Sequence, residues 1–125
     1  MVFLRGKKYS DSVLEYKSKF NLTDLESIIA GRAASDDSSS WTRKLVGMGL
    51  EKAVEKLGEE SVETVIAALA RDCDGLRDEA ADLLYHLLVV LHMKGVSVEQ
   101  VMAELERRTA QSGLAEKSAR KTDQS

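Results

Sequence analysis

Two pairs of acidic residues, each at helical spacing, constrain this chain more than any other feature of its sequence. The first pair is Glu60 and Glu63, and Glu59 directly precedes Glu60. The second pair is Glu79 and Asp82. Residues three apart lie on the same face of a helix, so each pair points in one direction. If the two helical segments fold back antiparallel, four carboxylates converge in one place.

Four carboxylates gathered without a counter-ion would repel one another, because like charges a few ångströms apart raise each other's pKa. A hard divalent cation removes this conflict, and carboxylate oxygen is the ligand that Mg²⁺ prefers. The interleaving of these acids with apolar stripes places them beside a core rather than on a solvated face. The pattern therefore predicts a magnesium site on a helical hairpin.

Two lysines, Lys52 and Lys56, precede the first acidic pair at helical spacing. Cations beside a carboxylate-bound metal favour a polyphosphate as the ligand. Surface ion pairs with Glu55, Glu59 and Glu60 explain the same lysines without any ligand, at well under ~1 kcal/mol each. The residues alone leave both interpretations open.

The remaining sequence predicts an all-α fold of four to five helices. The 125 residues include no proline, and apolar residues recur at helical spacing. The predicted helices are a short one that begins after the capping residues 21–24 and ends at Gly31, then 41–48, 50–70, 76–94 and 98–108, with a turn at 72–75. The long central helices are apolar over wide arcs, so we expect a homodimer or higher homo-oligomer to complete the core.

Three regions are expected along the chain. Residues 1–20 form an N-terminal extension of unclear role, 21–112 the helical domain, and 113–125 a polar tail. The net charge of −3 gives no reason to expect nucleic acid as a partner. The longest apolar run, 87–91, is too short to span a bilayer, and residues 1–10 contain no signal peptide. With a single cysteine, Cys73, the sequence suits the reducing cytoplasm.

The sequence resembles the phosphoribosyl-ATP pyrophosphohydrolases, which belong to the MazG-like all-α nucleoside triphosphate pyrophosphohydrolases. The resemblance covers roughly residues 21–120. Three stretches carry it: Ser40-Trp41-Thr42-x-Lys44-Leu45, then Glu51-Lys52-x-x-Glu55-Lys56-x-Gly58-Glu59-Glu60-x-Val62-Glu63-Thr64, and Asp78-Glu79-Ala80-Ala81-Asp82-Leu83-Leu84-Tyr85-His86-Leu87-Leu88. The acidic pattern is shared by the whole superfamily, whereas the flanking residues indicate the member that acts in the second step of histidine biosynthesis.

The resemblance implies a Mg²⁺-dependent hydrolysis of phosphoribosyl-ATP to phosphoribosyl-AMP and pyrophosphate. By this resemblance Glu59 is a further metal ligand, or it orients and deprotonates the attacking water. The implied metal ligands are Glu60, Glu63, Glu79 and Asp82. The candidate triphosphate contacts are Lys44, Lys52 and Lys56.

Four further residues are weaker candidates. Lys117 and Arg120 in the tail could close over the site, and Trp41 could stack on a base or serve only as a packing anchor. A metal or base role is conceivable for His86, four residues after Asp82, although a lone histidine on an apolar helix is more often a core residue.

Two other functions compete with this interpretation. A house-cleaning pyrophosphohydrolase of free nucleoside triphosphates would carry the same acidic pattern. A non-catalytic helical dimer would carry the acids on solvated faces, and Mg²⁺ would then not stabilise it. A ferritin-like di-iron site is excluded, because it requires Glu-x-x-His where this chain has Glu63 and Asp82.

Overall fold

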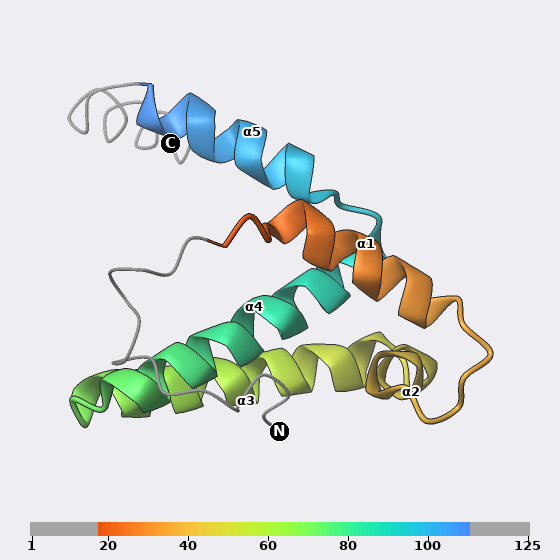
Figure 1. The fold of residues 1–125 in the computed structure, drawn as a ribbon, viewed down its shortest axis with the longest axis horizontal. Coiled ribbons are helices and arrows are strands. Elements are labelled where there is room, and N and C mark those ends of the chain that lie inside the picture. The colour runs from red at the N-terminus through yellow and green to blue at the C-terminus, as the bar shows by residue number, and fades with distance from the viewer. Residues whose placement is uncertain (1–17, 111–125) are drawn as a thin grey trace, which may run out of the picture.

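The structure, a computed structural model, describes residues 18–110. The described chain consists of helices joined by short loops, as the sequence predicts (Figure 1). The helices are α1 (Leu22–Ala33), α2 (Trp41–Gly47), α3 (Leu50–Leu69), α4 (Cys73–Lys94) and α5 (Val98–Thr109).

The two longest helices, α3 and α4, form an antiparallel hairpin that is the centre of the fold (Figure 1). The connection between them is the three residues 70–72, in which Arg71 adopts a left-handed φ of 57°. The carboxylate of Asp72 accepts a hydrogen bond from the Gly75 backbone N–H at 2.9 Å and so caps α4. Both predicted acidic pairs therefore lie on a common hairpin.

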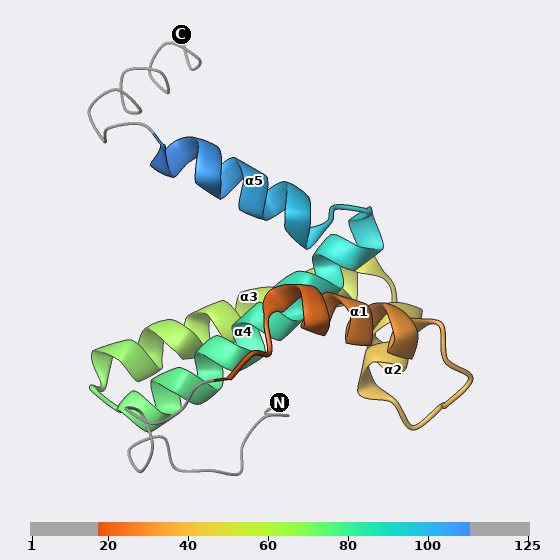
Figure 2. The same cartoon turned by 45° about the horizontal axis from the view of Figure 1, so that its top comes forward.

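Helices α1 and α2 pack on the end of the hairpin where α3 begins and α4 ends (Figures 1 and 2). The side chain of Leu45 on α2 is fully buried, as is that of Ile29 on α1. These helices begin at predicted capping residues: Asn21 and Asp24 form a capping box, and Ser40 caps α2. The buried apolar core draws on every helix and consists of Ile29, Leu45, Ala53, Tyr85, Leu88, Val89 and Val98.

Three predicted boundaries were wrong by more than one residue. Helix α1 begins at Leu22, directly after its cap Asn21, and not after Asp24. Residues 72–75 read as a turn, but residues 73–75 form the first turn of α4, because Asp72 supplies the cap that this turn needs. Gly31 does not end α1, which continues to Ala33. A glycine weakens a helix by only about 1 kcal/mol relative to alanine, and tertiary packing overrides that cost here.

Helix α5 leads away from the hairpin and is the least embedded helix of the described chain (Figure 2). It begins at the predicted capping box of Ser97 and Gln100, after Gly95 has ended α4 in a left-handed conformation with φ of 73°. The backbone N–H of Val98 also donates to the Glu26 carboxylate at 2.7 Å, which ties α5 to α1.

Within residues 18–110 no single helix combines the length and the apolar character needed to cross a membrane. Taken together, α4 and α5 meet the length and composition criteria for a membrane span, but the two helices are bent by 110° relative to each other.

Candidate functional site

Three of the four predicted carboxylates meet between α3 and α4. Glu60 of α3 and Glu79 and Asp82 of α4 each bring one oxygen within 4.8 Å of the others. Their exposed fractions are 1%, 9% and 0% respectively, so the group is almost completely removed from water. We call these three residues the acidic centre.

The fourth carboxylate, Glu63, is exposed and lies at the rim of the acidic centre. Hydrogen bonds with the side chains of Glu60 and Glu79 lower the pKa of Glu63. In contrast, burial raises the pKa of Glu60 to about 7, and the hydrogen bond and negative charge of Glu63 contribute to this increase. Of the two neighbours, Glu60 therefore holds the proton more tightly.

The backbones of the two helices are joined at the level of the acidic centre by Thr64. Its hydroxyl oxygen lies 2.8 Å from the carbonyl oxygen of Glu60 and 3.2 Å from the carbonyl oxygen of Glu79. A hydroxyl that bridges two carbonyls in this way fixes the distance between α3 and α4. The positions of the carboxylates consequently depend on a contact outside the acidic side chains themselves.

The donor set of the acidic centre fits a hard divalent cation. All three groups are carboxylates, and ionised carboxylates that are buried together carry a large desolvation and repulsion cost unless a cation balances them. The raised pKa of Glu60 expresses this cost in the metal-free protein. Oxygen donors of this kind are the ligands of Mg²⁺ rather than of a thiol- or imidazole-binding metal.

The predicted cationic residues differ in their distance from the acidic centre. Lys56 lies beside it: the ion pair with Glu59 raises the pKa of Lys56, and the charges of Glu60 and Glu63 add to the effect. The Lys56 ammonium is 3.0 Å from a Glu59 carboxylate oxygen, and the pairing lowers the pKa of Glu59. Glu59 itself is exposed and so lies on the rim with Glu63.

The other two lysines face outward. Lys52 is 3.5 Å from a Glu55 carboxylate oxygen, in a pair that is largely open to solvent. Lys44 is exposed on α2 and lies near Asp37: hydrogen bonds from Ser39 lower the pKa of Asp37, and the charge of Lys44 adds to this effect. Lys117 and Arg120 lie outside the described residues.

His86 is fully buried beside the acidic centre. Its Nδ1 is 2.7 Å from the backbone carbonyl oxygen of Asp82, and because a carbonyl only accepts, Nδ1 carries the proton. Burial lowers the pKa of His86, and the ring of Tyr85 packs against it edge-on at 4.9 Å. These contacts describe a neutral core histidine that supports the Asp82 backbone.

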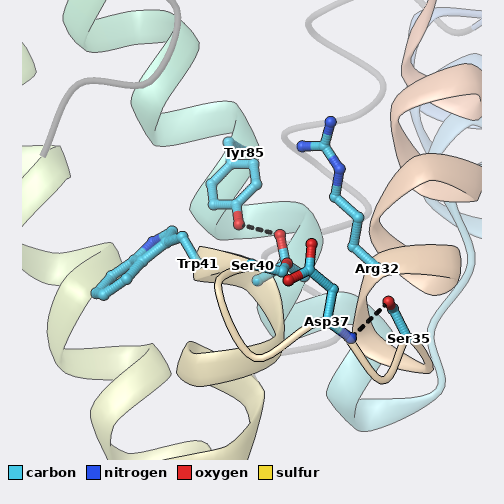
Figure 3. Close-up of a pocket in the computed structure, with 7 residues that line it drawn as sticks. Arg32, Ser35, Asp37, Ser40, Trp41 and Tyr85 are labelled. Atoms are coloured by element: carbon cyan, nitrogen blue, oxygen red, sulfur yellow. Dashed lines mark hydrogen bonds between the residues drawn. The ribbon is translucent and has the colours of Figure 1, made fainter.

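A cavity of about 280 Å³ lies beside Tyr85 (Figure 3). Tyr85 follows Asp82 by three residues, or about one helical turn. The sequence pointed to Trp41 alone among its lining residues as a candidate contact. The residues that line it come from α1, the loop after it, α2 and α4, and are Arg32, Ser35, Asp37, Ser40, Trp41 and Tyr85. Thr42 completes the wall, and its hydroxyl is hydrogen-bonded to the Tyr85 phenol.

One residue of the cavity wall could have been predicted from the sequence to lie near the acidic centre. Tyr85 follows Asp82 by three residues and so must share its helix face. The approach of Arg32 and Asp37 has no such signal, because it depends on how α1 and its following loop pack against α4.

Comparison with known proteins identifies relatives that match nearly the whole described chain. Residues 22–109 match the family described as phosphoribosyl-ATP pyrophosphohydrolase. The chain is similar to the phosphoribosyl-ATP pyrophosphatase of Agrobacterium fabrum, with 63% identity over 105 residues, which are 84% of this chain and 98% of the relative. The proteins of the same name from Rhizobium johnstonii, at 58% identity with coverages of 84% and 98%, and Methylobacterium radiotolerans, at 57% identity with coverages of 82% and 95%, are similar too.

Proposed function

The chain belongs to the phosphoribosyl-ATP pyrophosphohydrolase family, and from this membership we propose that it hydrolyses phosphoribosyl-ATP to phosphoribosyl-AMP and pyrophosphate. This reaction is the second step of histidine biosynthesis. The observation that carries the proposal is the buried acidic centre, since three carboxylates removed from water suit a metal-assisted phosphoryl reaction and no ordinary packing role.

In this function Glu60, Glu79 and Asp82 would hold Mg²⁺, and Glu63 at the rim would complete the set of ligands. When bound, the ion supplies positive charge that balances the phosphate oxygens as the anhydride is cleaved. The charge of Lys56 interacts with those of Glu60 and Glu63, so we infer that it is the best placed of the three predicted lysines to bind the triphosphate.

Glu59 is the candidate for contact with the attacking water. Its ion pair with Lys56 lowers its pKa, so the carboxylate is ionised at neutral pH and accepts a hydrogen bond. A lowered pKa also makes it a weaker base. Orientation of the water therefore suits Glu59 better than removal of its proton.

Substrate preference separates this proposal from its main alternative. We expect pyrophosphate release from phosphoribosyl-ATP in the presence of Mg²⁺, and much slower release from ATP, dCTP and dUTP at equal concentration. Faster release from a free nucleotide would retain the acidic centre but place the protein among the house-cleaning pyrophosphohydrolases. No release from any substrate, with no thermal shift by Mg²⁺, would support a non-catalytic helical dimer.

The stabilisation by Mg²⁺ should depend on pH. Because the pKa of Glu60 is raised to about 7, its proton stabilises the metal-free fold at low pH, and this contribution is lost as the pH rises through 7. Mg²⁺ must displace that proton, so its affinity should be roughly tenfold lower at pH 6 than at pH 8. Melting temperatures with and without Mg²⁺ at both pH values, with NaCl at matched ionic strength as control, measure this difference. An equal shift at the two pH values would contradict the assignment of Glu60 as a ligand.

A homodimer is the second part of the proposal. The outer face of α3 exposes an apolar stripe at helical spacing, with Val62 58%, Val65 57%, Ile66 60% and Leu69 80% accessible. Monomeric proteins rarely leave so many contiguous large apolar side chains in water. A second copy placed on this stripe would bury it symmetrically.

We also propose a cytoplasmic location, with neither a membrane nor nucleic acid as partner, on the basis of the family and the net charge of −3.

A further inference from the structure

We infer that the cavity between α1 and α4 binds the phosphoribosyl group that distinguishes phosphoribosyl-ATP from ATP, with Arg32 as the residue that recognises its phosphate. This inference rests on the proposed function and extends it to substrate selection. The cavity volume of about 280 Å³ is slightly below the roughly 300–1,000 Å³ of sites that enclose a drug-sized ligand, so the cavity suits one part of the substrate.

Position favours this assignment. Tyr85 in the cavity wall and Asp82 in the acidic centre are three residues apart on one face of α4, or about 5 Å along the helix axis. A single nucleotide can therefore reach both places, with its triphosphate at the acidic centre and another part of the molecule in the cavity.

The donors in the cavity favour a phosphate. Arg32 forms no ion pair with any other residue of the described chain, and its planar guanidinium matches phosphate oxygens. The hydroxyl oxygens of Ser35 and Ser40 accept backbone N–H groups at 3.0 and 3.3 Å. Each hydroxyl thus keeps a proton that it can donate to a ligand oxygen.

The arrangement of charge favours a sugar phosphate over a bare anion. Figure 3 shows the Arg32 guanidinium and the Tyr85 ring on opposite sides of the space, with the Asp37 carboxylate between them. One Asp37 oxygen accepts from the Ser39 backbone and hydroxyl at 2.9 and 2.6 Å. The Asp37 carboxylate can still accept hydrogen bonds from sugar hydroxyls, whereas its negative charge repels phosphate. The phosphate therefore belongs on the Arg32 side.

The lining argues against the adenine base as the occupant. A base needs an apolar or aromatic face on which to stack, whereas most of the lining side chains end in a charge or a hydroxyl. The indole of Trp41 is directed away from Arg32, on the far side of Tyr85 in this view (Figure 3).

The test compares Arg32→Met with the wild type, using KM for phosphoribosyl-ATP and the inhibition constant of ATP. We expect KM for phosphoribosyl-ATP to rise by roughly 10- to 100-fold, as for loss of a hydrogen bond to a charged group, and the inhibition constant of ATP to stay within about twofold. The KM of Arg32→Lys for phosphoribosyl-ATP should lie between those of the wild type and Arg32→Met, because the positive charge remains but the bidentate geometry of the guanidinium is lost. Arg108→Met, on exposed α5, is the matched control and should leave both constants unchanged.

Equal weakening of phosphoribosyl-ATP and ATP in Arg32→Met would overturn the inference, because the cavity would then serve a part common to both. No change in either constant would overturn it as well.

A binding measurement keeps this inference separate from the proposed function. Trp41 is the sole tryptophan of the chain and belongs to the lining of the cavity, so its fluorescence is the natural signal for occupancy of the cavity. Ribose 5-phosphate should change this fluorescence in the wild type and bind at least about tenfold more weakly to Arg32→Met. If the enzyme released no pyrophosphate from phosphoribosyl-ATP, the proposed function would fail, while this titration would still support or overturn the sugar-phosphate site.

Discussion

Glu60→Gln should lose metal-dependent pyrophosphate release while the metal-free protein becomes more stable at pH 8. The substitution keeps the size of the side chain but removes a buried negative charge, and with it one of the carboxylates proposed to hold Mg²⁺. Because bound metal contributes several kcal/mol to such reactions, we expect turnover to fall by roughly a hundred- to a thousandfold.

The gain in stability has the same physical origin as the loss of activity. Burial holds the pKa of Glu60 at about 7, so at pH 8 the folded protein bears the cost of an ionised, desolvated carboxylate. A neutral amide removes this cost. Thermal melts without Mg²⁺ should therefore show a higher melting temperature for Glu60→Gln than for the wild type, and addition of Mg²⁺ should narrow or reverse the difference.

Glu55→Gln is the matched control for this experiment. Glu55 lies on the same helix, is exposed, and forms only a solvated ion pair with Lys52. Its substitution should change neither turnover nor the thermal shift by Mg²⁺ beyond about twofold. Full activity of Glu60→Gln, or an equal loss in Glu55→Gln, would show that the acidic centre does not hold the metal.

Ile66→Glu should convert the proposed homodimer into a monomer. Ile66 is central to the exposed apolar stripe of α3, and a two-fold axis would place two copies of the new carboxylate in one interface. Each uncompensated buried charge costs about 3–5 kcal/mol, and the interface would contain two, so the dimer should weaken by more than about a thousandfold. Sedimentation velocity over a range of protein concentrations measures the change in mass.

Leu105→Glu provides the comparison for the dimer experiment. Leu105 is 47% exposed on α5, a helix that also presents apolar side chains but lies away from the hairpin. This variant should remain dimeric. Dissociation by Leu105→Glu, with Ile66→Glu unaffected, would place the interface on α5 instead.

The helices could be predicted from the sequence because local signals and core packing agree. Ser97 and Gln100 predict the start of α5, and together they form its capping box in the structure. The prediction was wrong at 72–75, where a polar Asp-Cys-Asp-Gly run has turn composition but Asp72 caps a helix instead. A capping aspartate and a turn aspartate are the same residue in the sequence, and only the following packing distinguishes them.

The acidic centre was predictable for a similar reason, and the cavity was not. Helical spacing alone brings Glu79 and Asp82 together, and a short connection between α3 and α4 brings Glu60 to them. Glu63 departs from the prediction only in lying at the rim. The approach of Arg32 to Tyr85 depends on tertiary packing between helices far apart in the sequence, for which no periodicity exists.

The confinement of the acidic centre to a single hairpin has a consequence for how the chain folds. Contacts between segments that are close in sequence form early, and the hairpin of α3 and α4 is closed by only three residues. We therefore expect the carboxylates to approach one another before the other helices have packed on the hairpin. Because burial is the main cause of the raised pKa of Glu60, the cost of its negative charge arises only as the carboxylate is removed from water, and we expect that later step of folding, rather than the first closure of the hairpin, to depend on pH.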